Sequence, residues 1–197
     1  MKSSTRTEPE LDADELLHLA ILDSKAGRHD VAIAKLKQAA EQAPGNAKIH
    51  YLLAAEHAEI GLFDRAIDGM NKAVSLDGEL VTAHLQLGLL YLTQGRPREA
   101  ESAWARLDRL GPDDALYLFK SALLKLEAGD PAGAVPMLED AAKNVRGNPA
   151  LVKDIQRVLA NIKPVAASDA GSSKAAAKSP PAHLLATKYS ESGNDER

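Results

Sequence analysis

Apolar residues recur at helical spacing along most of the chain. Ala32, Leu36 and Ala39 stand at i, i+4 and i+7, which places them on one face of an α-helix. The same stripe returns at intervals of 34 residues, as Ala66, Met70 and Ala73, then Ala100, Trp104 and Leu107, then Ala134, Leu138 and Ala141. The pattern therefore predicts four amphipathic helices at one fixed period.

A glycine lies five residues before each of these stripes, at Gly27, Gly61, Gly95 and Gly129. Ahead of the glycines run two further columns, Leu19, Leu53, Leu87 and Ser121, each followed by a small residue, Ala20, Ala54, Gly88 and Ala122. Glycine forms a tight corner at little cost because a positive φ meets no side-chain clash there. Each period thus predicts two helices joined by a glycine corner, with the small residues where the two helices approach closely.

Proline and short polar residues mark the expected helix starts. Pro97 and Pro131 follow their glycines by two residues, which suits the first turn of a helix. Asn46, Asp114 and Asn148 precede the next helix, where a side-chain oxygen can accept a hydrogen bond from an unpaired backbone N–H group. The sequence therefore predicts N-caps at these three positions.

This 34-residue arrangement resembles the tetratricopeptide repeat family, whose pattern has a leucine and a small residue, a corner glycine, then alanine, a bulky apolar residue and alanine. With Ala13 as the first position, the repeats are 13–46, 47–80, 81–114 and 115–148. The resemblance implies an all-α fold, a right-handed α-solenoid of antiparallel helix pairs. Residues 13–162 would form this domain.

The chain departs from the family pattern in three columns. Leu16, His50, His84 and Leu118 stand where the family has tryptophan. The family's tyrosine at position eleven is present only as Tyr91, and the closing proline is replaced by Gly78 in repeat two and by Arg146 in repeat four. Repeat four is therefore the weakest match, although its corner glycine and second-helix stripe are intact.

The two ends of the chain differ from the repeats. Residues 149–162 carry a stripe of Leu, Val and Ile at helical spacing, which predicts a capping helix over the last repeat. Residues 1–12 are expected to be a flexible N-terminus. Residues 163–197 are rich in Ala, Ser, Pro and Lys, a composition typical of a disordered tail. One apolar segment interrupts it at 182–189 (AHLLATKY), a candidate occupant of the solenoid's own groove.

Composition excludes several classes of function. Of the 197 residues 45% are apolar, which is enough for a core, while the net charge of −4 and the 4% of aromatic residues argue against nucleic-acid binding. Cysteine is absent, so thiolate chemistry and sulfur-ligated zinc are excluded. The polar start of the chain and the short longest apolar run, Leu87 to Leu92, predict a cytoplasmic protein without membrane insertion.

Candidate catalytic and metal-binding groups give no coherent site. His50 and His57 lie two helical turns apart, too far to share a metal ion without a third ligand, and His50 and His84 occupy the tryptophan column, where their rings would fill space between helices. The carboxylate pairs Asp113–Asp114 and Glu139–Asp140 are interpreted as caps or surface charge. We expect no enzyme activity, no cofactor and no metal.

The resemblance implies that the first helix of every pair lines a concave groove. Third-repeat residues Leu85, Leu89 and Leu92 add an apolar stripe beside the face formed by Leu87 and Gly88, more than one packing face needs. The expected partner-binding residues are Leu17, Ile21, Lys48, Tyr51, Ala55, Leu85, Leu89, Leu92, Leu116, Phe119 and Leu123. Some could pack against neighbouring first helices, but we expect the set as a whole to leave an exposed apolar surface, which usually marks a partner site.

The chain lacks the carboxylate clamp with which co-chaperones of this family hold acidic C-terminal peptides. At the clamp positions, in either alignment with the repeats, only Lys120 is basic. We therefore expect a protein or peptide partner with apolar anchors, bound in a chaperone-like manner. The alternative is an assembly scaffold that bridges two folded proteins. The oligomeric state is left open.

Overall fold

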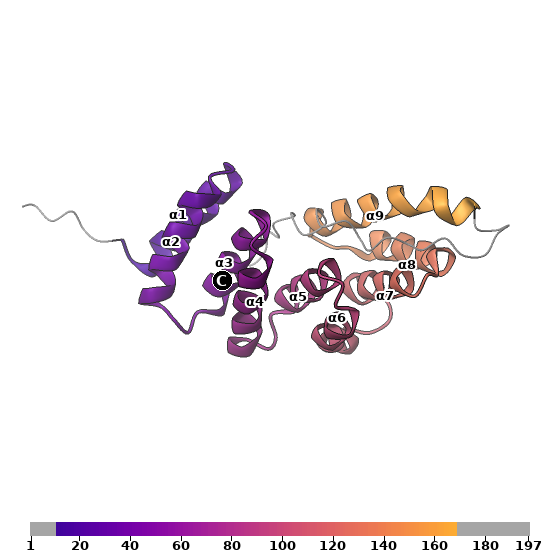
Figure 1. Ribbon diagram of the computed structural model, residues 1–197, viewed down its shortest axis with the longest axis horizontal. Helices are drawn as coiled ribbons and strands as arrows, with labels where there is room; N and C mark the ends of the chain where they lie inside the picture. Colours follow the sequence, from indigo (N-terminus) through magenta and orange to yellow (C-terminus); the bar gives the residue numbers. More distant parts are fainter. Residues whose placement is uncertain (1–10, 169–197) are drawn as a thin grey trace, which may run out of the picture. The chain divides into compact units, whose positions relative to one another are not determined.

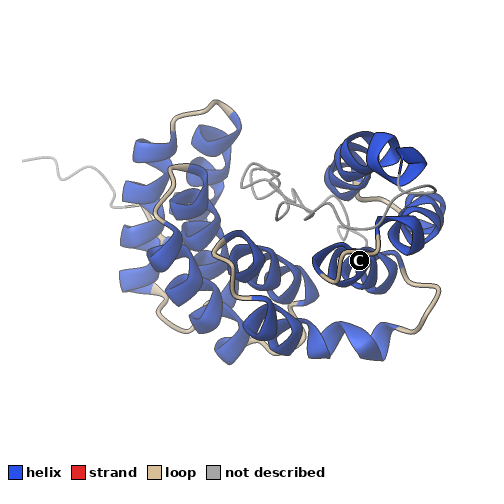
Figure 2. Cartoon of the chain, turned by 45° about the vertical axis from the view of Figure 1, so that its right-hand side comes forward, coloured by secondary structure: helices blue, strands red, loops and turns tan. Residues whose placement is uncertain are grey.

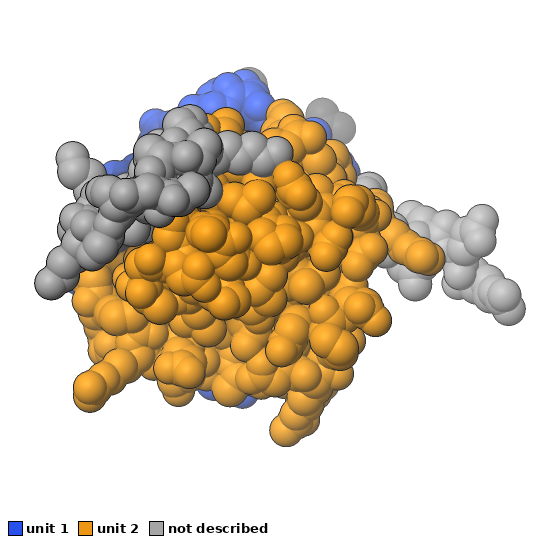
Figure 3. Space-filling model, turned by 90° about the vertical axis from the view of Figure 1, so that its right-hand side faces the viewer, with its two compact units in different colours: residues 1–77 blue, residues 78–197 orange. Residues whose placement is uncertain are grey.

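The computed structural model describes residues 11–168, and side chains for residues 11–162. All elements in this range are helices (Figures 1 and 2). Residues 1–10 of the expected flexible N-terminus and residues 169–197 of the expected tail, including the apolar segment 182–189, lie outside the described residues. The chain divides into two compact units, Met1–Asp77 and Gly78–Arg197, which Figure 3 distinguishes by colour.

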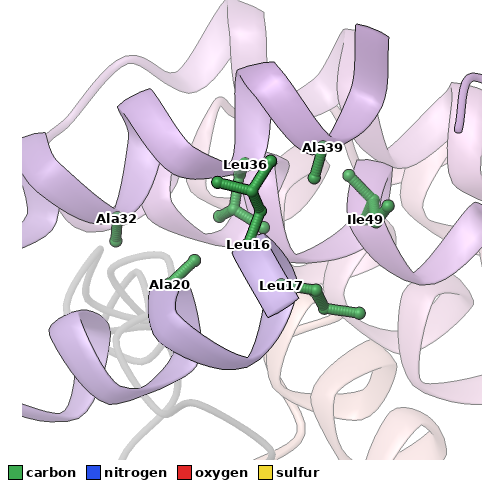
Figure 4. Close-up of a cluster of buried hydrophobic side chains, with 7 residues drawn as sticks. All are labelled: Leu16, Leu17, Ala20, Ala32, Leu36, Ala39 and Ile49. Carbon is green, nitrogen blue, oxygen red and sulfur yellow. The ribbon is translucent and has the colours of Figure 1, made fainter. Parts of the chain in front are cut away.

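Unit 1 contains two helix pairs. Helix α1 (Ala13–Lys25) packs against α2 (His29–Gln42), and α3 (Ala47–Glu59) packs against α4 (Phe63–Leu76), while α2 also contacts α3. A cluster of small and large apolar side chains from α1, α2 and α3 fills the space between them (Figure 4): Leu16, Leu17, Ala20, Ala32, Leu36, Ala39 and Ile49. The expected alanine columns thus lie where helices meet.

Unit 2 repeats this arrangement with one irregular element. Helix α5 (Val81–Thr93) packs against α6 (Pro97–Trp104), which continues as a 3₁₀ helix, η1 (Ala105–Leu110). Helix α7 (Ala115–Glu127) packs against α8 (Pro131–Asn144), and α9 (Pro149–Ser168) packs against α8. The second helix of repeat three is therefore a short α-helix followed by a tighter turn, which the apolar spacing alone did not predict.

The first helices begin at 34-residue intervals: α1, α3, α5, α7 and α9 start at residues 13, 47, 81, 115 and 149. The predicted N-caps are confirmed, because Asn46 and Asp114 accept hydrogen bonds from the second and third N–H groups of α3 and α7, and Asn148 accepts one from Leu151 N–H in α9. The four corner glycines have φ between +68° and +77°, as their predicted role requires.

Helix α9 is longer than the sequence pattern predicted. The expected capping helix ended at residue 162, and a disordered tail was expected from 163, but α9 continues to Ser168. The prediction followed the apolar stripe, which stops at Ile162. Residues 163–168 combine Ala166 and Ala167, which favour a helix, with Pro164, which disfavours one, so neither the apolar stripe nor propensity predicts this last part of α9.

Helices α5 and α6 of unit 2 meet at Gly88 and Trp104. Trp104 is fully buried on α6, and its indole N–H donates to the backbone carbonyl of Leu85 on α5 at 3.0 Å. A Cβ atom on Gly88 would lie 2.0 Å from the Trp104 Nε1 atom, so any side chain at residue 88 would clash with the indole ring. Trp104, part of the apolar stripe on the second helix of repeat three, is therefore a core residue.

Candidate partner-binding surface

The expected groove residues of unit 1 lie on α1 and α3 with graded exposure. Leu17 and Tyr51 are buried, at 9% and 6% exposure, whereas Ile21 and Ala55 are half-buried and Lys48 is exposed. Unit 1 therefore presents a partly apolar surface on its first helices, with a positive charge on the first turn of α3.

In unit 2 the expected exposure is wrong. Leu85, Leu89 and Leu92 on α5 and Phe119 and Leu123 on α7 are all buried, as is Tyr51 in unit 1, and of the unit 2 set only Leu116 is half-buried. The expectation allowed for packing against neighbouring first helices but not for an additional element such as η1. In the structure α7 contacts η1 and α6 as well as α8, and η1 also packs on α5, which leaves less free surface than a single layer of pairs would. The role of these residues in binding stays a prediction.

One polar side chain on α5 has an unsatisfied group. Gln86 is only 5% exposed, and within the described part of the chain its amide nitrogen has no hydrogen-bond partner. Its neighbours along the helix are Leu85 and Leu87. A buried amide donor without an acceptor costs about 1–3 kcal/mol, so a ligand carbonyl that reached this nitrogen would be favoured.

A polar network at the end of α1 was not predicted from the sequence. Asp23 accepts hydrogen bonds from Arg28 (2.6 Å) and Lys35 (2.5 Å), and the bonds from Lys35 and then Arg28 hold the pKa of the Asp23 carboxyl below its usual value. Buried Glu56 on α3 accepts from the Ser24 hydroxyl and contacts His29 Nδ1 at 2.8 Å. These contacts tie α1, α2 and α3 together.

A sequence signal for this network exists in the repeat columns. Ser24 aligns with Leu92 and Leu126, and Glu56 aligns with Leu90 and Leu124. The Ser24 column also contains Ala58, so both columns otherwise hold apolar residues, and a polar residue in such a column indicates a buried position that needs a polar partner.

His57 on α3 is also buried, at 7% exposure, and neither ring nitrogen has a hydrogen-bond partner among the described residues. Burial lowers the pKa of its imidazole, and the positive charges of Lys37 and then Arg65 lower it further, against a smaller raising effect of Glu56. The ring is therefore held in its neutral form.

The other histidines that the sequence singled out are structural. In the tryptophan column, His50 Nε2 lies 2.8 Å from the Pro44 carbonyl oxygen, and His84 contacts the carbonyls of Ala103 and Gly78. The His84 ring thus lies against α6, in agreement with the predicted packing between helices, whereas the contact of the His50 ring is with the loop before α3. Among the described residues, no group of three His, Asp or Glu side chains is arranged to hold a metal ion.

A cleft in unit 2 borders Leu116, where the start of α7, the end of α8 and the start of α9 meet. Its lining is of mixed charge: Asp113, Asp114, Ala115, Leu116, Lys143, Asn144, Val145, Arg146, Asn148 and Leu151. Asp114 and Asn148 act as helix caps, and the Asn144 amide donates to the Asp113 carbonyl. These polar groups of the cleft lining therefore already have hydrogen-bond partners within the chain.

Comparisons with known proteins agree with this architecture. A thermophilic tetratricopeptide repeat protein of Thermus thermophilus superposes with a TM-score of 0.64 at 20% identity, covering 78% of this chain and 82% of its own. MamA gives 0.58 at 23% identity over 67% of this chain and 77% of its own, and pilF of Pseudomonas aeruginosa gives 0.59 at 21% over 82% and 78%. At these identities the likeness establishes the fold alone.

Sequence relatives identify the family. The small glutamine-rich tetratricopeptide repeat-containing protein 2 of Saccharomyces cerevisiae is 28% identical over 92 residues, which span 47% of this chain and only 27% of the yeast protein. Within the described residues, every helix is too short or too polar to cross a membrane. Tetratricopeptide repeat families match residues 24–73 and 85–151. The chain therefore belongs to the tetratricopeptide repeat family, an α-solenoid fold whose members mediate protein–protein interaction.

Proposed function

We propose that this chain is a non-catalytic cytoplasmic binding module that holds an apolar peptide or helix of a partner along the first helices of its repeats, in a chaperone-like manner. The proposed contact residues are Leu17, Ile21, Lys48, Tyr51 and Ala55 in unit 1, and Leu85, Leu89, Leu92, Leu116, Phe119 and Leu123 in unit 2. The two units each contribute their own surface.

The observation that carries the proposal is the buried, unpaired amide of Gln86 on α5, whose other buried residues are alanine, leucine and glycine. An apolar ligand alone would not satisfy it, but a peptide brings a carbonyl every residue. If the apolar anchors of a peptide packed on Leu85 and Leu89, in place of the side chains that now bury them, a peptide carbonyl would come within reach of the Gln86 amide nitrogen. Because these leucines are covered in the free chain, binding here requires the cover to open, whereas Ile21 and Ala55 in unit 1 are already partly accessible.

A peptide array tests the ligand class. The full-length chain is applied to immobilised peptides of about 15 residues, four helical turns, with Leu, Tyr or Phe anchors, and to matched peptides in which serine replaces each anchor. We expect retention only on the anchored peptides. Equal retention on both sets would overturn the proposed apolar recognition.

The Gln86→Leu variant tests whether the Gln86 amide contributes to binding, measured as affinity for the peptide that the array retains most strongly. Removing the unpaired amide at similar volume should leave stability unchanged or raise it, while affinity for the peptide falls by about fivefold or more, the loss of roughly one hydrogen bond. Gln94→Leu, an exposed glutamine at the end of the same helix, is the matched control and should leave affinity unchanged. Unchanged affinity in Gln86→Leu would remove Gln86 from the site.

The partner's folding state separates chaperone from scaffold. If the chain suppresses aggregation of a thermally unfolded test protein and the anchored peptide competes, the chaperone-like mode is supported. If it binds only natively folded partners, two at a time, the scaffold alternative holds and the groove proposal fails.

A further inference from the structure

Helix α1 has apolar surface on two opposite sides. On one side Leu16, Leu17 and Ala20 are buried in the cluster with α2 and α3 (Figure 4). On the other side His18 and Leu22, one helical turn apart, are both exposed. Leu22, at 47% exposure, is the most exposed of the large apolar side chains described. Only one of the two sides of α1 therefore lies in the core of unit 1.

A shallow hollow continues the exposed side toward the start of α1. It is lined by Leu11, Asp14, Glu15, His18 and Leu19. Leu11 is 39% exposed and Leu19 is half-buried, so the hollow is mainly apolar, with the two carboxylates at its edge. These residues, with Leu22 and Lys25, are here called the outer stripe of α1.

The repeat columns show what this side of a first helix does elsewhere in unit 1. Glu15 aligns with Ile49 on α3, and Leu22 aligns with Glu56. Ile49 is fully buried in the cluster of α1 and α2, and buried Glu56 accepts a hydrogen bond from the Ser24 hydroxyl of α1. In repeat two this side therefore packs on the preceding repeat. For repeat one the described residues include no such repeat, so the outer stripe is open to a partner.

The outer stripe carries opposite charges at its two ends. Asp14 lies in the first turn of α1 and Lys25 in the last turn, and both side chains are exposed. Eleven residues separate them, about three full helical turns or roughly 16 Å, so both charges lie along the same side of the helix. A ligand of uniform charge would meet a like charge at one end. A second α1 that runs antiparallel brings each Asp14 toward the Lys25 of the other helix, with the Leu22 side chains between the charged ends.

We propose that the outer stripe of α1 binds the outer stripe of a second copy of this chain, with the two helices antiparallel about a two-fold axis. In such a closed pair the same patch serves both partners, so the patch must be complementary to itself. One helix face of about four turns covers less than the roughly 800 Å² per partner of a stable interface. The dimer is therefore weak and reversible, half-formed on the order of 0.1 mM, and the chain is monomeric at low micromolar concentration.

This surface does not include the proposed peptide contacts of α1, Leu17 and Ile21, so self-association and peptide binding can be tested separately. Sedimentation equilibrium of the full-length chain between about 5 μM and 1 mM measures the association. We expect the average mass to rise from the monomer value of 21.0 kDa toward twice that value. Leu22→Gln should weaken the dimer by about tenfold or more, since Leu22 is the central apolar contact of both copies. Ile60→Gln, a change at a similarly exposed apolar position of unit 1, should leave it unchanged.

Charge reversal tests the antiparallel arrangement. Asp14→Lys and Lys25→Glu, each alone, create two like-charge contacts because the axis repeats every contact, so each should weaken the dimer by about fivefold or more. An equimolar mixture of the two variants should associate again, because the new lysine of one variant then faces the new glutamate of the other. Helical circular dichroism checks that all variants are folded.

Three results would overturn the proposal. The first is a chain that stays monomeric up to about 1 mM, as it would if another segment of the chain covered the stripe. The second is a dimer that Leu22→Gln and Ile60→Gln weaken equally, because the interface would then lie elsewhere. The third is a mixture of the two charge variants that associates no better than either variant alone, because the helices would then not be antiparallel.

Discussion

At the scale of single residues, the third repeat differs from its neighbours in how it fills one contact. In the other repeats alanine on the first helix is paired by column with leucine or methionine on the second: Ala20 with Leu36, Ala54 with Met70, and Ala122 with Leu138. Repeat three has Gly88 with Trp104, and the indole occupies the space that an alanine methyl would need. Repeat three therefore has a smaller residue on its first helix and a larger residue on its second helix than the other repeats have at these positions.

This exchange predicts strong coupling between the two positions. Gly88→Ala should destabilise by about 1–3 kcal/mol through overpacking, although alanine is the better helix former. In the Trp104→Leu background, which itself costs about 2 kcal/mol or more through a cavity, the same Gly88→Ala change should become neutral or stabilising. Urea denaturation of the four proteins, followed by circular dichroism, measures the cycle. Additive costs would contradict the prediction.

The burial of His57 predicts that unit 1 loses stability on mild acidification. The folded-state pKa of His57 is lowered below its unfolded value near 6.5, so the unfolded chain binds the proton first, and stability falls as pH drops below about 6.5. Asp23 responds only in a more acidic range, because its lowered pKa matters below its unfolded value near 3.9.

Urea midpoints between about pH 7.5 and 5.5, in chloride buffers free of sulfate, phosphate and carboxylates, measure this effect. His57→Gln should flatten the dependence, whereas His18→Gln, at an exposed position of α1, should retain it. Circular dichroism is the suitable probe, because the only tryptophan, Trp104, lies in unit 2. An unchanged slope in His57→Gln would mean that another group titrates.

At the scale of helices, the caps set where each repeat begins. Asp114 accepts hydrogen bonds from the Leu116 N–H (2.8 Å) and the Tyr117 N–H (3.4 Å) of α7. Asp114→Ala should therefore destabilise unit 2 by about 1 kcal/mol. Asp113→Ala is a matched control one residue away, because its exposed side chain is not the cap. Thermal unfolding followed by Trp104 emission distinguishes them, and equal losses would contradict the capping role.

Helix positions were predictable because the signals for them are local. Corner glycines, caps and apolar stripes each act within one or two turns of the chain, so Asn46 and Gly27 could be interpreted without knowing the fold. The break between α6 and η1 and the last turn of α9 carry no such local signal. Those features needed the structure.

At the scale of the whole molecule, the fold class followed from the 34-residue period, but the exposure of the individual side chains on the first helices did not. Position in a repeat indicates which helix a residue belongs to, and it placed Leu85 and Phe119 on first helices. Whether such a residue is covered depends on neighbouring helices and connections such as η1, which the period does not encode. The polar network of Asp23 and Glu56 differs, because the repeat columns of Ser24 and Glu56 do carry a signal for it.

The chain beyond α9 gives a prediction at this scale. Removing residues 169–197 should leave the thermal midpoint within about 4 °C, roughly 1 kcal/mol, since every described helix is retained. The apolar segment 182–189 remains a candidate occupant of the unit 2 surface, because a random coil of about 13 residues, the length between Ser168 and Ala182, would span on the order of 20 Å. Hydrogen exchange of 85–92 and 116–126, with and without 169–197, measures occupation. Identical protection would reject it.

The Gly88–Trp104 contact also constrains how this sequence can evolve. A lineage that moved from this pair toward the alanine–leucine pair of the neighbouring repeats by single substitutions would pass through either a clash or a cavity. Because either single substitution would lower the stability of the fold, a change at one of the two positions is tolerated only when the other position changes as well. Repeat three is thereby held apart from its sister repeats in sequence, even though all four repeats share one helical period.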